Sequence, residues 1–161
     1  ARDKDAIVAV MALCEAAAFY KSKGLTLWDQ MINIFDKYGY YKEGQKAITM
    51  KGAEGAAQIA QMMDDLRKNP PKKFGDWDVV EFRDYKTKEC TDIKTGAKSD
   101  TGLPVSNVLY FDLTDNAWCC ARPSGTEPKI KFYMGVKGTD LDDANEKLAK
   151  LTDAVMEAIG Q

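Results

Sequence analysis

The chain has 161 residues, of which 45% are hydrophobic and 30% are charged, and its formal net charge is −2. These values are typical of a globular protein, and the balanced charge argues against nucleic-acid binding, which needs a clustered basic surface. No run of about 20 apolar residues indicates a membrane span, and no signal peptide opens the sequence. We therefore expect a cytoplasmic protein with neither a nucleic-acid nor a membrane partner.

Two amphipathic helices are predicted at the start of the chain. Apolar residues recur at helical spacing over residues 3–23 and again from Leu27 to about residue 38. Thr26 and Asp29 stand at the spacing of a capping box, which marks the start of the second helix. We expect residues 1–38 to form a helical hairpin that is separate from residues 39–161.

From Tyr40 onwards, alternating apolar residues predict strands and two stretches return to helical spacing. The predicted strands are residues 47–50, 77–85, 108–111, 118–121 and 130–134. The predicted helices are residues 53–68 and a final helix that begins after Thr139. Residues 88–104 are rich in Thr, Lys, Asp and Gly, and we expect a long surface loop there.

The order of these elements predicts the fold class. Consecutive strands joined by short turns pair in the antiparallel direction, and amphipathic helices must bury their apolar faces against such a sheet. We therefore expect an α+β fold, an antiparallel sheet of four to five strands with helices on one face, preceded by the N-terminal αα-hairpin.

Chemically active residues are scarce. The sequence has no histidine, which removes the commonest general base and metal ligand, and its four cysteines lack metal-ligand spacing. We expect free thiols at Cys14, Cys90, Cys119 and Cys120. The carboxylates at positions 140, 142 and 143 fall at the start of the last helix, where they serve as capping and dipole residues. The sequence thus predicts no catalytic residue and no metal site.

The turn between the last two predicted strands concentrates groups that bind anions. Arg122 has a planar fork of donors, Ser124 and Thr126 have hydroxyls, Gly125 leaves its backbone N–H accessible, and Lys131 adds a charge. These residue types suit a phosphate dianion. They also suit an ordinary polar hairpin whose hydroxyls cap their own backbone and whose cations are solvated, so residue types alone leave both interpretations open.

A resemblance favours the phosphate-binding interpretation. The segment Arg122-Pro-Ser-Gly-Thr-Glu-Pro-Lys-Ile-Lys-Phe-Tyr133 resembles the phosphate-binding loop in the C-terminal domain of α-D-phosphohexomutases, most closely the bacterial phosphoglucomutases and phosphomannomutases. More loosely, Arg2–Asp5 and the helix after it resemble the end of that family's third domain. Tyr38–Tyr41 resembles the segment that leads into the fourth domain. The resemblance implies that residues 1–38 are the remnant of a preceding domain and residues 39–161 are the phosphate-binding domain.

The resemblance also implies a chemistry for the parent enzyme. A phosphoserine, assisted by Mg²⁺, exchanges phosphoryl groups between the 1- and 6-positions of glucose or mannose phosphate. Arg122, Ser124, Gly125, Thr126 and Lys131 would hold the phosphate that is not being transferred. Many relatives carry Arg at the position of Lys131, and Lys cannot form a bidentate contact.

Other parts of the family pattern do not occur in this sequence. We find no serine loop, no Asp-rich metal motif and no sugar-specificity loop, so the fragment should catalyse nothing without the N-terminal domains of the same enzyme. The alternative is a free-standing α+β binding module with no role in sugar-phosphate chemistry.

Overall fold

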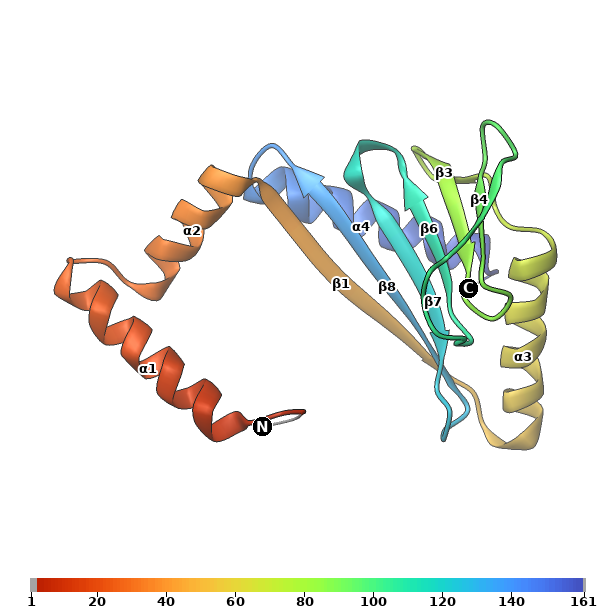
Figure 1. Cartoon of the computed structure of the whole chain (residues 1–161), viewed down its shortest axis with the longest axis horizontal. Helices are drawn as coiled ribbons and strands as arrows, with labels where there is room; N and C mark the ends of the chain where they lie inside the picture. Colours follow the sequence, from red (N-terminus) through yellow and green to blue (C-terminus); the bar gives the residue numbers. More distant parts are fainter. Residues whose placement is uncertain (1–2, 161) are drawn as a thin grey trace. The chain divides into compact units, whose positions relative to one another are not determined.

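The computed structural model describes residues 3–160 and divides into two compact units, one ending at Tyr40 and the other beginning at Tyr41. Figure 1 traces the chain from the N-terminal helices through the sheet to the last helix. Arg2, the first residue of the predicted third-domain segment, lies outside the described residues. The two units are described in turn.

The first unit consists of α1 (Ala6–Ser22) and α2 (Leu27–Tyr38), the predicted helical hairpin. The predicted capping box is confirmed, because the Asp29 N–H donates to Thr26 Oγ1 at 3.1 Å and the Thr26 N–H donates to Asp29 Oδ2 at 2.8 Å. Among the described residues of these two helices none is buried, and large apolar side chains such as Ile7 and Trp28 are exposed. The helices of this unit have hydrogen-bonded N-caps, but their described residues form no buried core.

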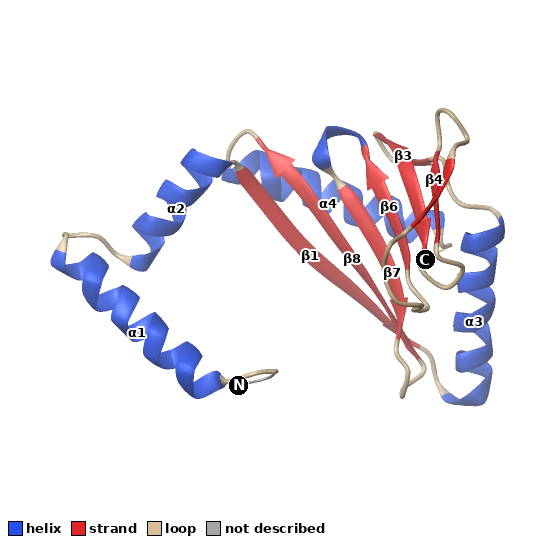
Figure 2. Ribbon diagram, in the orientation of Figure 1, coloured by secondary structure: helices blue, strands red, loops and turns tan. Residues whose placement is uncertain are grey.

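The second unit is built on an open antiparallel sheet of eight strands (Figure 2), and this confirms the predicted α+β class. The predicted number of four to five strands was too low, because the short strands β2, β4 and β5 lack an apolar alternation that marks them in the sequence. Seven strands follow the order β1-β8-β7-β6-β3-β4-β5, and β2 pairs with β3 outside that path. The strands are β1 (Tyr40–Thr49), β2 (Lys73–Phe74), β3 (Trp77–Asp84), β4 (Glu89–Asp92), β5 (Lys98–Asp100), β6 (Leu109–Leu113), β7 (Trp118–Pro123) and β8 (Lys129–Gly138).

The core lies between one face of this sheet and the helices α3 (Gly52–Lys68) and α4 (Leu141–Ala158). Alternate residues of β3, β6, β7 and β8 are buried and cluster with the apolar stripes of both helices. Phe111 contacts Phe74 and Phe82, with ring centroids 5.3 and 4.9 Å apart. Each buried side chain of this kind contributes about 1.5–3 kcal/mol to folding. Helices α3 and α4 therefore cover the same face of the sheet, as expected.

The prediction of a long surface loop at residues 88–104 is wrong, because β4 and β5 form a hairpin there. In these two strands only Cys90 is buried, so the apolar alternation that marks a strand is missing. A local turn closes the hairpin instead. Asp92 Oδ1 accepts hydrogen bonds from the Thr95 N–H at 2.7 Å and from its hydroxyl at 2.8 Å. Gly96 supplies the positive φ of 70° that the turn requires.

Candidate functional site

The turn between β7 and β8 carries the residues that the sequence singled out. The two strands pair so that Arg122 lies directly opposite Lys131, one position before the turn closes from Pro123 to Ile130. Ala121 and Ile130, their neighbours in sequence, point into the core. Side chains alternate along a strand, so Arg122 and Lys131 lie on the face of the sheet opposite α3 and α4.

Arg122 and Lys131 are two like charges on adjacent strands. Within residues 3–160 neither side chain forms an ion pair or a hydrogen bond. The neighbouring Lys129 differs, since its Nζ lies 3.3 Å from Glu127 Oε2. Like charges directly opposite on a sheet are destabilising, by roughly 0.2–1 kcal/mol. An anion between the two cations would remove this repulsion.

Donors at the tip of the turn face the same region. Ser124 Oγ accepts long hydrogen bonds from the Thr126 N–H at 3.4 Å and the Glu127 N–H at 3.3 Å, and its own hydroxyl proton is left to donate. The Gly125 N–H donates to no group within the described chain. A Cβ on Gly125 would meet no atom within 4 Å, so packing does not require glycine at this position. Its lack of a side chain leaves the backbone open to a ligand.

These groups line a hollow of about 270 Å³, large enough for a phosphate group. Its lining residues are Arg122, Pro123, Ser124, Gly125, Glu127, Lys129, Lys131 and Tyr133. Three cations and one carboxylate make it electropositive. Four of the five predicted phosphate-binding residues are thus brought together, and Thr126 is the one that does not line this hollow.

Lys129 and Tyr133 are additions that sequence reasoning missed as site residues. The signal was present, because period-two alternation along β8 places residues 129, 131 and 133 on one face of the strand. Their partial burial, alternating with buried residues in β8, agrees with that placement.

A second and larger pocket, of about 530 Å³, lies on the other side of the turn, against α3. Thr126 lines it together with Asn107 and the α3 residues Gly52, Ala56, Ile59, Ala60 and Met63. The two hollows share Pro123, Ser124, Gly125 and Glu127. The turn therefore lies between the two hollows, and each of them is large enough for a ligand.

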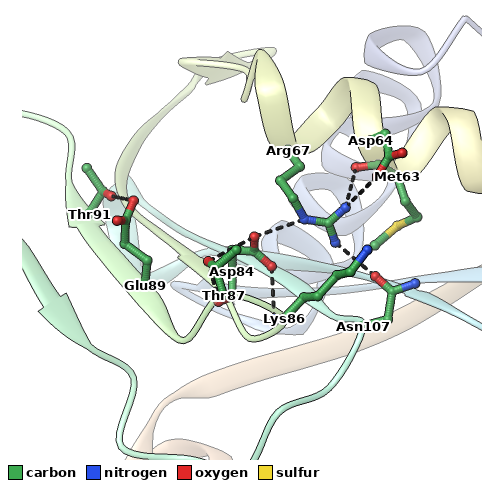
Figure 3. A network of polar contacts seen from close by, with 9 residues as sticks. All are labelled: Met63, Asp64, Arg67, Asp84, Lys86, Thr87, Glu89, Thr91 and Asn107. Carbon is green, nitrogen blue, oxygen red and sulfur yellow. Dashed lines mark hydrogen bonds and ion pairs between the residues drawn. The ribbon is translucent and has the colours of Figure 1, made fainter.

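A polar network holds Asn107, one of the residues that line this second pocket, and Figure 3 shows the network from close by. Arg67 of α3 donates from Nε to Asp84 Oδ2 at 2.9 Å and from a terminal nitrogen to Asn107 Oδ1 at 2.8 Å. Asp84 is only 3% exposed, and it also accepts from the Lys86 N–H and the Thr87 hydroxyl, both at 3.0 Å. Arg67 thereby ties the segment before β6 to α3 and β3.

The thiol nearest to the site in the sequence is not activated. Cys120 lies two residues before Arg122 on the same face, but burial raises the pKa of its thiol to about 11, despite an opposing effect of the Arg122 charge. The thiol is therefore protonated at neutral pH. All four cysteines are free, as expected.

The acidic residues near the start of α4 act as caps. Asp140 Oδ1 accepts from the Asp143 N–H at 2.9 Å, and Asp143 Oδ2 accepts from the Thr139 N–H at 2.8 Å. Hydrogen bonds from Lys147 and then from Thr139 lower the pKa of Asp143. Over residues 3–160, no three His, Cys, Asp or Glu side chains gather as metal ligands would. The helices in the same range are too short or too polar to cross a membrane.

Comparison with known proteins places this geometry in context. No protein-family model matches the chain. Phosphoglucomutases from Staphylococcus aureus strains MRSA252, MSSA476 and MW2 are each 35% identical to it over 147 residues. The match covers 91% of this chain and 26% of each relative, so the chain spans about a quarter of the length of the curated relatives it matches. The predicted resemblance is confirmed to this extent: the chain matches one region of a phosphohexomutase.

Proposed function

We propose that the chain is the C-terminal part of a phosphoglucomutase- or phosphomannomutase-type enzyme, and that its β7–β8 turn holds the phosphate group of a hexose phosphate. The phosphate held is the one that is not being transferred. The match to phosphoglucomutases supports the parent class. The observation that carries the binding role is the cross-strand pair of Arg122 and Lys131, which lack anionic partners within the described chain and flank the bare Gly125 backbone.

Each group has a distinct part in binding the phosphate. The Arg122 guanidinium suits two oxygens at once, and Lys131 supplies a point charge to the third. The Ser124 hydroxyl and the Gly125 N–H add neutral donors at the tip of the turn. Thr126, on the α3 side, can join them if the phosphate lies across the turn. The result is positioning and charge neutralisation, which phosphoryl transfer chiefly requires of a protein.

In this proposal the parent enzyme moves a phosphoryl group between the 1- and 6-positions of the sugar through a phosphoserine. The serine, the Mg²⁺ ligands and the residues that choose glucose or mannose would belong to the other domains. Residues 1–38 would be the remnant of the preceding domain, and a cytoplasmic location stays a prediction from the sequence.

The competing function is a free-standing α+β binding module. A polar turn on an antiparallel sheet would serve such a module as well. What it does not account for is an identity of 35% that extends over 91% of the chain, far beyond the turn. We therefore favour the mutase fragment.

Phosphate contact tests the proposal. Amide spectra of the 161-residue chain, recorded during titration with inorganic phosphate and with glucose 1-phosphate, should shift at residues 122–131. The affinity should be weak, with a Kd of about 1 mM or above, because only part of a binding cleft is present. Shifts spread over the surface, or none in residues 122–131, would leave the free-standing module as the better description.

Variants sharpen the same test. Arg122→Ala removes a charge-assisted contact worth about 1.5–3 kcal/mol, so the affinity should fall roughly tenfold or more. Lys72→Ala is a matched control, since Lys72 is an exposed lysine outside both hollows. Equal losses from the two variants would point to non-specific attraction of an anion to a charged surface.

A further inference from the structure

We infer that Asn107 is a binding residue for the polyhydroxylated carbon skeleton of the phosphate ester, which enters the pocket between α3 and the β7–β8 turn. This inference rests on the proposed function, because it assumes that the turn holds the phosphate. It assigns a role to the α3-side pocket, which phosphate binding alone does not use. Three observations lead to it: the orientation of the Asn107 amide, the lining of the pocket, and the residues that the two hollows share.

The orientation of Asn107 follows from its partner. A guanidinium can donate but cannot accept, so the Asn107 atom 2.8 Å from the Arg67 terminal nitrogen must be the carbonyl oxygen Oδ1. Arg67 is held in turn by Asp84 and Asp64, each at 2.9 Å. Figure 3 shows the amide nitrogen of Asn107 on the side away from Arg67. Asn107 therefore offers two N–H donors, from a side chain whose rotation is restricted.

The pocket that Asn107 lines is suited to a sugar ring. Its floor on α3 consists of the small residues Gly52, Ala56 and Ala60 with Ile59 and Met63 beside them. Apolar surface of this kind can pack against the C–H faces of a sugar, and a few fixed polar groups then orient its hydroxyls. Thr126, which has a hydroxyl, and Asn107, which has an amide, are polar residues that line the pocket.

Continuity with the anion site selects the ligand. Ser124 and Gly125 line both the electropositive hollow and the α3-side pocket. A phosphate bound at these two residues can therefore direct its ester oxygen towards either side of the turn. The side of the turn away from α3 is occupied by the cations, whereas the α3 side has room, with a volume of about 530 Å³. The ligand is thus a phosphate monoester with hydroxyls close to the ester carbon, and not a bare anion.

The discriminating quantity is the ratio of the affinities for glucose 1-phosphate and inorganic phosphate, measured by amide shifts in the 161-residue chain. Asn107→Asp keeps an oxygen for Arg67 but removes the donor. We expect it to lower the ratio by about threefold to tenfold, the effect of one lost hydrogen bond. The added charge weakens both ligands and largely cancels in the ratio. Asn116→Asp makes the same substitution in the β6–β7 turn, outside both pockets, and should leave the ratio unchanged.

Asn107→Ala removes the same donor without adding a charge, and the same affinity ratio is measured for it. Thermal unfolding checks that both variants are folded. A ratio equal to that of the unsubstituted chain in both variants would overturn the role of Asn107 and leave the phosphate site intact. If neither ligand shifts residues 122–131 in the unsubstituted chain, the proposed function itself is wrong, and the inference is wrong with it.

Discussion

The α3–β3 junction and the β7–β8 turn are each built around one arginine, but the two arginines are in opposite electrostatic surroundings. Arg67 is largely buried and contacts two carboxylates and an amide. Arg122 is exposed, has a lysine opposite it, and has no carboxylate partner among the described residues. Removing a paired, buried arginine is costly because it leaves a buried carboxylate uncompensated, whereas an unpaired arginine beside a like charge is available for a ligand. The comparison thus distinguishes Arg67, which supports the structure around the site, from Arg122, which is available to bind the ligand.

The largest effect is expected at the paired arginine. Arg67→Ala leaves the buried Asp84 carboxylate without its cation, and should lower the free energy of unfolding by about 3 kcal/mol. Chemical denaturation measures this. Asp64→Ala is the matched control, because Asp64 is the exposed partner of the same arginine and should cost less than about 1 kcal/mol. Similar losses from both substitutions would show that burial does not distinguish the two ion pairs.

An intermediate effect is expected at the cation opposite Arg122. Lys131→Arg replaces a point charge with a fork that can bind two phosphate oxygens, so it should tighten phosphate binding by about threefold to tenfold. The amide titration with inorganic phosphate measures the change. The same substitution at Lys72 should have no effect on the affinity. Unchanged or weaker binding by Lys131→Arg would place the anion out of reach of residue 131.

The smallest effect is expected from removing the first unit. The core draws only on residues of the second unit, from Ile48 to Ile159, and no described residue of α1 or α2 is buried. Deleting residues 1–38 should therefore change the free energy of unfolding by less than about 1 kcal/mol and leave phosphate binding as it was. Unfolding of the remaining chain would show that residues 39–161 are not an independent domain.

Much of the fold could be predicted because the buried residues of most helices and strands recur in the sequence at the helical or strand period. Helix α3 was predicted at residues 53–68 and is observed at Gly52–Lys68, where Asn69-Pro70-Pro71 prevents continuation. The β4–β5 hairpin was missed since its only buried side chain is Cys90. Strands that face solvent on both sides have no apolar alternation to detect.

The candidate site could be predicted in its residue types but not in its geometry. The turn chemistry pointed to Arg122, Ser124, Gly125, Thr126 and Lys131, whereas the cross-strand register depends on how the turn closes. That Thr126 lines the other pocket depends on the path of the turn. The role of Asn107 could not be anticipated either, because its contact with Arg67 joins residues 40 positions apart in the sequence.

The central claim is that Arg122 and Lys131 form an opposed pair of cations that an anion joins. A double-mutant cycle with Arg122→Ala, Lys131→Ala and the double variant tests it directly, with urea unfolding measured without anion and at saturating inorganic phosphate. We predict a repulsive coupling of about 0.5 kcal/mol without phosphate and a favourable coupling with it. The same coupling in both conditions would contradict the claim that the two cations share a phosphate.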